Sequence, residues 1–319
     1  FPALVTSGRM TNRTSQSSRS CNSCSSTGTY ACASNLERNS SILNVREKRS
    51  LPSEMIVMRH SERVDDIFNG WTKKAVKDGV YSPYDLNMPP SLPINRPIEN
   101  YALDTPITVN GQVIAKMIGR GLFVMKKVPD VIYCSPSLRC LQTAHAVKTL
   151  SQSKAKLRVE PAIFENPHLY RAMPTLATKE ERAQFDVDER YQPLIRLKDL
   201  FSKEERIKSY NARIKDVLLR IAATTEPSPD TARPLTVLVV GHASTVDLAV
   251  GVLNPKQRQT SMMDLHRIGD RIPYCATVLF RRQASYWEPI PDAIPPVTYR
   301  NFSNRVCHEF VYRTNSEET

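Results

Sequence analysis

The sequence predicts an α/β fold, a three-layer α/β/α sandwich with a mostly parallel central sheet, over residues 52–314. Two observations carry this prediction. Short apolar runs alternate along the chain with amphipathic segments of helical period, which is typical of strands separated by helices. Several of the apolar runs are also continuous rather than alternating, as in strands that are buried on both faces.

Five strands are expected. The first is Met55-Ile56-Val57-Met58, which leads into Arg59 and His60. The others are expected at Val131–Cys134, Leu157–Val159, Thr236–Val240 and Thr277–Arg281. Residues 82–100 are rich in proline and asparagine, which predicts a long irregular stretch after the first strand.

Two helices are expected in the middle of the chain. Thr108 is typical of an N-cap and opens a helix from Val109 to about Leu122. The apolar face of this helix is expected to hold Val113, Met117 and Ile114. The second helix is expected to run from about Ser137 to Leu150.

A third helix is expected to begin at a capping box, in which Ser202 and Glu205 lie three residues apart. It reaches about Ala223. Its apolar positions are Ile207, Ile214, Val217, Leu218 and Ile221. The preceding residues 166–200 have mixed polarity and several prolines, which predicts an insertion that covers one edge of a site.

Residues 1–51 predict a disordered, basic, serine-rich tail, and residues 315–319 a short C-terminal tail. The first fifty residues contain twelve serines and few large apolar groups, so they cannot bury enough surface to offset the entropy of ordering. They also hold seven Arg/Lys and two acidic residues, so +5 of the chain's net charge of +12 lies in this segment. The remaining excess is spread among acidic residues, which argues against nucleic-acid binding.

Cysteine usage and hydropathy limit the class of protein further. Of seven cysteines, Cys21 and Cys24 form a Cys-x-x-Cys pair, but no second Cys/His pair follows at zinc spacing, so no metal is expected. Cys134 falls in a predicted strand, where a free thiol packs as a small apolar group. A reduced, cytoplasmic protein is expected. No run of about 20 apolar residues occurs, so no membrane span is expected. The chain begins with Phe1, which indicates a fragment, a processed form or an incomplete gene model.

Histidines and arginines stand directly after the predicted strands. The first strand ends in the segment 59–65, Arg-His-Ser-Glu-Arg-Val-Asp, and the fourth in 240–243, Val-Gly-His-Ala. Residues 135–144, Ser-Pro-Ser-Leu-Arg-Cys-Leu-Gln-Thr-Ala, follow the second strand, and Phe-Glu at 164–165 follows the third. Because a parallel sheet places its reactive groups beyond the carboxyl ends of its strands, these segments are expected to share one pocket.

In this order, the four segments resemble the histidine phosphatase (phosphoglycerate-mutase-like) superfamily. Within it they are most similar to the phosphatase domain of the ubiquitin-associated and SH3 domain-containing proteins and to the ecdysteroid-phosphate phosphatases. Residues 272–275, Ile-Pro-Tyr-Cys, also look like that branch. The resemblance covers residues 54–282. It implies a phosphoglycerate-mutase-like fold and a metal-independent reaction with no cofactor.

The expected chemistry begins at His60, whose neutral imidazole supplies a nitrogen nucleophile for phosphorus. Neighbouring arginines favour the neutral form by repelling a second positive charge. Arg59, Arg63 and Arg139 are expected to bind the phosphoryl oxygens through charge-assisted hydrogen bonds. Arg139 begins a predicted helix, whose dipole also favours an anion.

Two further residues are expected to complete the site. His242 is the second histidine of the pocket and donates to a phosphoryl oxygen. Glu165 is the candidate acid–base residue, which protonates the leaving oxygen and then activates water. Glu62 and Asp65 are expected to orient arginines. The remaining histidines are expected to be structural or solvated: His145, His168, His266 and His308.

The sequence departs from the family at two positions. Ser61 stands where the superfamily usually has glycine, and serine fits such a position if its φ is negative. Asn166 stands where the closer relatives have tryptophan. This loop is expected to line the leaving-group side of the pocket, so the resemblance does not indicate which substrate the chain prefers.

The sequence therefore predicts a phosphomonoester hydrolase that works through phospho-His60. Its relatives act on phosphotyrosine proteins or on bulky, steroid-type phosphates, and they form dimers, which this sequence neither supports nor excludes. The alternative is a catalytically silent module of the same fold that recognises phosphorylated partners. No nucleic acid and no membrane is expected as a partner.

Overall fold

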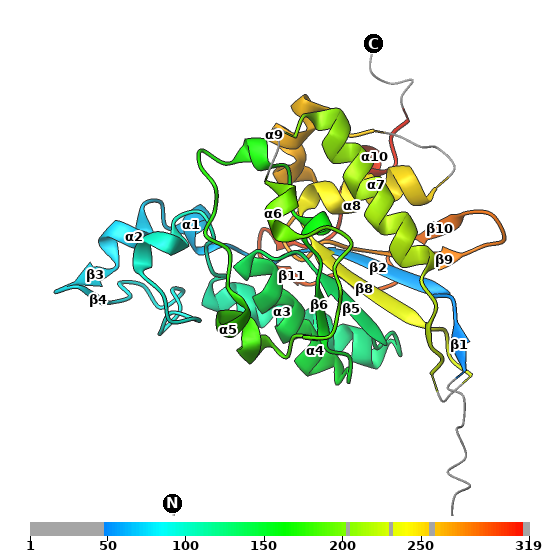
Figure 1. The fold of residues 1–319 in the computed structure, drawn as a ribbon, viewed down its shortest axis with the longest axis horizontal. Helices are drawn as coiled ribbons and strands as arrows, with labels where there is room; N and C mark the ends of the chain where they lie inside the picture. Colours follow the sequence, from blue (N-terminus) through cyan, green and yellow to red (C-terminus); the bar gives the residue numbers. More distant parts are fainter. Residues whose placement is uncertain (1–47, 202–204, 230–231, 255–258, 315–319) are drawn as a thin grey trace, which may run out of the picture. The chain divides into compact units, whose positions relative to one another are not determined.

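The computed structural model describes residues 48–201, 205–229, 232–254 and 259–314 (Figure 1). The predicted N-terminal tail lies outside these residues except at its end, where β1 (Arg49–Ser50) pairs with β7 (Glu226–Pro227). The predicted C-terminal tail also lies outside them. Within the described residues, no helix has the length and hydropathy needed to cross a membrane.

A six-stranded sheet forms the middle layer, in the order β10-β9-β2-β8-β5-β6. β2, β8, β5 and β6 are parallel, whereas β9 pairs antiparallel with β2 and with β10. The strands are β2 (Glu54–Arg59), β5 (Val131–Cys134), β6 (Leu157–Val159), β8 (Thr236–Gly241), β9 (Thr277–Arg282) and β10 (Trp287–Ile290). The five predicted strands and the mostly parallel sheet are thus confirmed, and β10 is additional.

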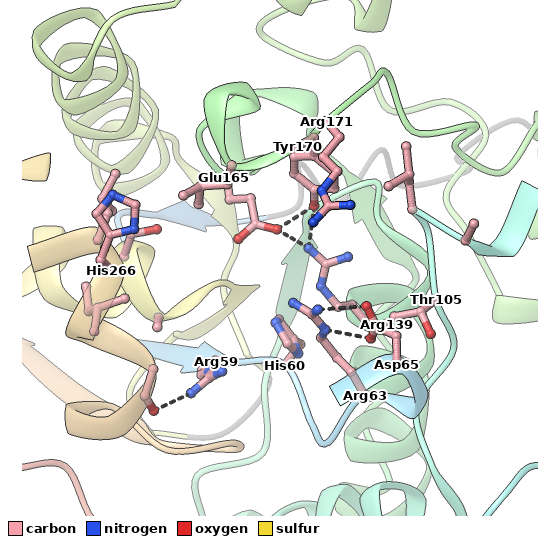
Figure 2. A pocket seen from close by; sticks show the side chains of 18 residues that line it. Arg59, His60, Arg63, Asp65, Thr105, Arg139, Glu165, Tyr170, Arg171 and His266 are labelled. Atoms are coloured by element: carbon pink, nitrogen blue, oxygen red, sulfur yellow. Dashed lines mark hydrogen bonds and ion pairs between the residues drawn. The ribbon is translucent and has the colours of Figure 1, made fainter. Parts of the chain in front are cut away.

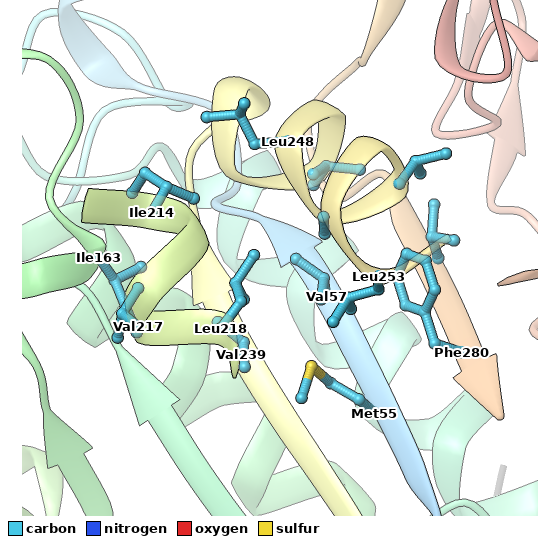
Figure 3. Packing of buried hydrophobic residues seen from close by; sticks show 14 of the residues in the cluster. Met55, Val57, Ile163, Ile214, Val217, Leu218, Val239, Leu248, Leu253 and Phe280 are labelled. Carbon is cyan, nitrogen blue, oxygen red and sulfur yellow. The ribbon is translucent and has the colours of Figure 1, made fainter. Parts of the chain in front are cut away.

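Helices cover both faces of this sheet, as the continuous apolar runs predicted (Figure 1). On β2, Met55 and Val57 face one core while Ile56 and Met58 face the other. The first core lies under α7 (Ile207–Ala223) and α8 (Ala243–Leu253), and Figure 3 shows its packing. The second lies under α3 (Val109–Val124) and α4 (Leu138–Ser151). These four side chains of β2 are fully buried, so packing on both faces of the sheet fixes the strand that leads to the first site residues.

The predicted start of α3 is confirmed. Of its predicted apolar face, Ile114 is partly buried against the second core, but the prediction is wrong for Val113 and Met117. Thr108 is the N-cap, and its side chain accepts a hydrogen bond from the amide of Gly111. Val113 and Met117 are 45% and 50% exposed. The buried residues of this helix are Gly111, Ala115, Ile118, Gly119 and Leu122, and a Cβ on Gly119 would lie 2.5 Å from the carbonyl oxygen of Val147 on α4. The glycine permits the close approach of the two helix backbones, and Val113 and Met117 lie off the buried face.

The helix α7 begins later than predicted. Its N-cap is Arg206, and the predicted capping residue Ser202 lies outside the described residues. Glu205 pairs with Arg213 at 2.5 Å rather than capping the helix. The predicted apolar face is confirmed for Ile214 and its three partners further along the helix, which are fully or almost fully buried.

Short elements fill the remaining segments. Before α3 lie α1 (Val64–Ile67), α2 (Trp71–Lys74), β3 (Val76–Lys77), β4 (Val80–Tyr81) and the 3₁₀ turn η1 (Ile98–Tyr101). After β6 lie η2 (Pro161–Ile163), η3 (Pro167–Leu169), α5 (Lys179–Arg182), η4 (Ala183–Phe185) and α6 (Leu197–Leu200). The C-terminal part contains α9 (Met262–Arg271), β11 (Thr298–Tyr299), β12 (Phe302–Ser303) and α10 (His308–Val311).

Candidate active site

A cavity of about 560 Å³ lies at the carboxyl ends of the parallel strands, where the sequence predicted it (Figure 2). It is lined by residues from the end of β2, the start of α4, the loop after β6, the start of α8 and one face of α9. Five of the six predicted site residues line it: Arg59, His60, Arg63, Arg139 and Glu165. The sixth, His242, is buried next to the cavity, with its ring centroid 5.5 Å from that of His60.

His60 is 2% exposed and follows β2 directly. Its amide donates to the carbonyl of Gly241 on β8, at 2.9 Å, so the sheet pairing fixes its backbone. Its Nδ1 lies 2.8 Å from the carbonyl oxygen of Ser61. Since a carbonyl can only accept, Nδ1 carries the proton and Nε2 keeps its lone pair. The tautomer thus leaves Nε2 as a nucleophile.

The charge state of His60 suits this role. Burial lowers the pKa of His60 well below 6.5, and the positive charges of Arg139 and Arg59 lower it further. Desolvation disfavours the charged imidazolium, and like charges nearby do the same. The imidazole is therefore neutral at physiological pH.

Arg59 is anchored to α9 and to an aromatic ring. Its Nη1 donates to the carbonyl oxygens of Gly269, at 2.9 Å, and Ile272, at 2.5 Å. Its guanidinium lies 4.1 Å from the ring centroid of Tyr274, whose hydroxyl donates to Asp66. The buried Nε of Arg59 has no hydrogen-bond partner. An unpaired buried donor is costly, so a group that accepts from it here would be stabilised.

Arg139 enters the pocket from the first turn of α4 and is 1% exposed. Its Nη2 donates to the carboxylate of Glu165, to the hydroxyl of Tyr170 at 2.7 Å and, at 3.3 Å, toward Nδ1 of His242. Its Nε is buried without a partner, like that of Arg59. Two arginines of the pocket thus each hold one unsatisfied donor.

Arg63 is partly exposed and forms a two-pronged ion pair with Asp65, with distances of 2.9 and 2.8 Å. The prediction that Asp65 orients an arginine is therefore confirmed. The same prediction is wrong for Glu62, which accepts hydrogen bonds from Thr108 at 2.6 Å and Asn87 at 3.1 Å. Glu62 fastens the loop after β2 to the start of α3.

Glu165 lies between η2 and η3 and reaches the middle of the pocket (Figure 2). Burial raises the pKa of its carboxyl group, but the interactions with His242 and Arg139 and a hydrogen bond from Tyr170 outweigh burial and lower it to about 2. The carboxylate is therefore ionised in the ligand-free pocket. It can accept a proton there, but it has none to donate.

His242 caps α8 and is 1% exposed. Its Nε2 lies 2.9 Å from Oγ of Ser135, and its Nδ1 lies 3.5 Å from a carboxylate oxygen of Glu165. Burial lowers the pKa of His242 to about 3, although Glu165 opposes this. His60 and His242 are thus both neutral, and they stand beside Arg59 and Arg139.

The two departures from the family occupy defined places. Ser61 is fully buried, its φ is not positive, and its hydroxyl donates to the carbonyl of Gly111 at 2.6 Å. Serine therefore fits this position without backbone strain. Asn166 is also buried, and its side chain accepts from the amide of His168, so it caps η3 instead of lining the pocket.

Sequence reasoning missed several pocket residues. Tyr170 and Tyr274 contact the predicted arginines, and Ser135 contacts His242. His266 on α9 lines the cavity, whereas the sequence assigned it no part in a site. Of these residues, only Tyr274 and Ser135 belong to the segments on which the resemblance to the family rests. Tyr170 and His266 gave no signal, because their places depend on how η3 and α9 fold over the pocket.

No group of three or more His, Cys, Asp or Glu side chains that could hold a metal ion occurs within the described part of the chain. The cysteines there are free, and Cys134 is buried in β5 as predicted.

The fold and the pocket define an α/β protein whose arginine-rich anion site is built around two histidines at the strand ends. The chain belongs to the histidine phosphatase superfamily (branch 1), whose family model matches residues 99–272.

Individual relatives agree with this family. The chain is 33% identical to ecdysteroid-phosphate phosphatase of Drosophila melanogaster over 255 residues, which are 77% of this chain and 33% of that protein. It is 31% identical to ubiquitin-associated and SH3 domain-containing protein B of Homo sapiens over 256 residues, 77% of this chain and 38% of that protein. The chain thus spans roughly a third of the length of these curated relatives.

A solved structure agrees as well. The crystal structure of ecdysone phosphate phosphatase from Bombyx mori in complex with tungstate superposes with a TM-score of 0.63 and 26% identity. The match covers 77% of this chain and 95% of that chain. The predicted fold class and family are therefore confirmed.

Proposed function

We propose that this chain hydrolyses phosphomonoesters by double displacement through a phosphohistidine on His60. The observation that carries the proposal is the unprotonated Nε2 of His60 beside two arginines whose buried Nε atoms lack acceptors. A phosphoryl group bound next to Nε2 supplies the oxygens that Arg59 and Arg139 need. The starts of α4 and α8 line the same space and add two helix dipoles that favour an anion.

In the first step, Nε2 of His60 attacks phosphorus, an N–P bond forms and the ester P–O bond breaks. Arg59, Arg63 and Arg139 stabilise the equatorial oxygens as their charge develops. His242, which is held by its hydrogen bond with Ser135, completes the group of residues around the phosphoryl group. In the second step, water attacks phosphorus, the N–P bond breaks and phosphate leaves.

Glu165 serves as the acid–base residue. It is ionised in the free pocket, so it needs a proton before it can donate one to the leaving oxygen. Binding of a phosphate dianion adds a like charge and draws Arg139 toward the phosphoryl oxygens, and both changes raise the pKa of Glu165. In the second step, the carboxylate takes the proton of the attacking water.

The apolar part of the cavity lining supports a bulky, apolar leaving group. It includes Leu103, Leu169, Leu265 and Ile268. The four arginines and two carboxylates that line the cavity leave a formal charge of +2, which one phosphate dianion balances. The second phosphate of a bisphosphate would therefore find no uncompensated positive charge among these lining residues. The relatives named for ecdysteroid phosphates support a steroid-type phosphate as substrate, and a phosphotyrosine protein fits the same wall.

The test is turnover of para-nitrophenyl phosphate, phosphotyrosine peptides, steroid phosphates and sugar phosphates, each with and without EDTA. Rapid-quench labelling should trap phosphoenzyme in the wild type and none in His60→Ala. His308→Ala, which changes a histidine on α10 outside the cavity, is the matched control. Phosphate-dependent binding without turnover would support the silent binding module instead, and label retained in His60→Ala would overturn the nucleophile assignment.

A further inference from the structure

Tyr170 stands at the end of η3, between two of the charged residues of the pocket (Figure 2). Its ring stacks on Phe164, with centroids 5.4 Å apart and planes at 25°. Phe164 is fully buried, and its ring meets the edge of His242 at 5.9 Å. The position of the Tyr170 hydroxyl is therefore set by packing, because its ring rests on a core side chain.

The hydroxyl of Tyr170 joins Glu165 to Arg139. It donates to Oε1 of Glu165 and accepts from Nη2 of Arg139 at 2.7 Å. Burial raises the pKa of Tyr170 well above 10, and the Glu165 charge raises it further although Arg139 opposes this. The phenol thus stays protonated and stays a donor.

Substrate binding changes the partners of this hydroxyl. Nη2 of Arg139 is shared among Glu165, Tyr170 and, at longer range, His242. When a phosphoryl group takes Arg139, the Glu165 carboxylate loses its ion pair. The hydrogen bond from Tyr170 does not depend on Arg139 and remains.

We propose that Tyr170 is a positioning residue of the reaction, whose hydroxyl holds the Glu165 carboxylate in place as the proton acceptor once Arg139 has turned to the phosphoryl group. This inference rests on the proposed phosphatase function. It gives the loop after β6 a part in catalysis that does not involve contact with the substrate.

The charged and titratable groups that face Glu165 come from several elements. Arg139 lies on α4, His242 at the start of α8 and Arg63 on the loop after β2. Arg59, at the end of β2, also interacts with Glu165. The charges of the arginines, the interaction with His242 and the donor of Tyr170 favour the ionised carboxylate. Removing that donor alone should therefore raise the pKa of Glu165, because a hydrogen bond to the charged form is lost.

The test compares Tyr170→Phe with Tyr191→Phe. Tyr170→Phe keeps the ring stacked on Phe164 and removes only the hydroxyl. Tyr191 donates to Glu160 at 2.5 Å outside this cavity, so Tyr191→Phe removes a hydrogen bond of the same kind elsewhere. With para-nitrophenyl phosphate, a good leaving group, kcat reports mainly on water attack. Tyr170→Phe should lower kcat roughly 10- to 100-fold, the size of one hydrogen bond to a charged group.

The pH profile separates positioning from a merely structural role. The acidic limb of kcat should move to higher pH in Tyr170→Phe, with little change in KM, and should not move in Tyr191→Phe. An unmoved limb, or a rise in KM with an unchanged kcat, would overturn the inference and leave the proposed function standing. No turnover by the wild type would overturn the proposed function and this inference together.

Discussion

The two sides of the pocket are built differently. On the strand-end side, Arg59, His60 and His242 follow buried parallel strands and are at most 9% exposed. On the loop side, Tyr170, Arg171 and His266 belong to a 3₁₀ turn, a loop and α9, and the last two are exposed. Glu165 stands between the two sides.

Under the proposed function, this difference divides the residues that hold the phosphoryl group from those that contact the rest of the substrate. The strand-end groups are placed by backbone hydrogen bonds within the sheet, so their geometry depends on the core. Tyr170 and Arg171 are placed by a short turn and a loop, and His266 by the exposed face of α9; loops can change without altering the core. In the proposed function, the strand-end side would bind and transfer the phosphoryl group. The loop side would contribute Tyr170 to the placement of Glu165, and its other two side chains would contact the leaving group.

Among the variants that test the comparison of the two sides of the pocket, Glu165→Gln is expected to cause the largest loss of turnover. The amide keeps the shape but cannot take or give the proton, and such catalysis is typically worth about 10²–10⁴-fold. Para-nitrophenyl phosphate should lose least, because its leaving group needs no proton, whereas an alkyl phosphate should lose most. Rates across leaving groups of different pKa measure this. Equal losses for all esters, with no phosphoenzyme accumulating, would mean that Glu165 only shapes the pocket.

The strand-end side should also dominate the acid sensitivity of the fold. Because the pKa values of His60 and His242 are lowered in the folded state, the unfolded chain takes up these protons first as the pH falls. Stability should therefore decline from about pH 6.5 downward, by at most about 1.4 kcal/mol per pH unit for each histidine. Glu165 adds to the decline between pH 4.5, the usual pKa of a glutamate, and about pH 2, because its pKa is also lowered in the folded state.

Urea unfolding at pH 7, 6 and 5 measures this slope. His242→Gln should remove up to half of it, because one of the two protons is no longer taken up on unfolding. A slope equal to that of the wild type would mean that the neutral state of His242 does not limit stability in acid.

A smaller effect is expected for Ser61→Ala, on stability rather than on rate. The change removes the additional hydrogen bond to the carbonyl of Gly111, which lies within α3, and a typical hydrogen bond contributes about 0.5–1.5 kcal/mol. Turnover should change less than about tenfold, since the backbone amide of Ser61 keeps its bond to Thr143 at 2.9 Å. Thermal melting is the measurement, with the exposed Ser285→Ala as control. An unchanged melting temperature would contradict a structural role for this hydroxyl.

The smallest effect is expected for Arg171→Ala on the loop side. Arg171 is exposed and forms no ion pair with any residue that the structure describes. Its loss should raise KM for a phosphorylated peptide roughly two- to fivefold, and the difference should shrink at high salt, because exposed charges are weak and screened. Arg190→Ala, an exposed arginine outside this cavity, is the control. A large fall in kcat would place Arg171 with the reacting groups.

The sequence alone determined the sheet and the strand-end side. Continuous apolar runs such as that before Arg59 demand burial on both faces, and parallel strands end at one edge, so His60, Arg139 and His242 had to meet there. These are local patterns with a single three-dimensional outcome. The N-cap Thr108 belongs to the same group, because its hydrogen bond is made within one turn.

Only the tertiary structure decided the rest. Val113 and Met117 fit the helical period as well as Ile118, Gly119 and Leu122, which are actually buried, and the close approach of α3 to α4 chose between them. The places of Tyr170 and His266 depend on how short turns and α9 pack over the pocket, for which the sequence has no periodic signal. The ionised state of Glu165 depends on the arrangement of His242, Arg139 and Tyr170 around it, because a pKa is set by distances in space and not by neighbours in the chain.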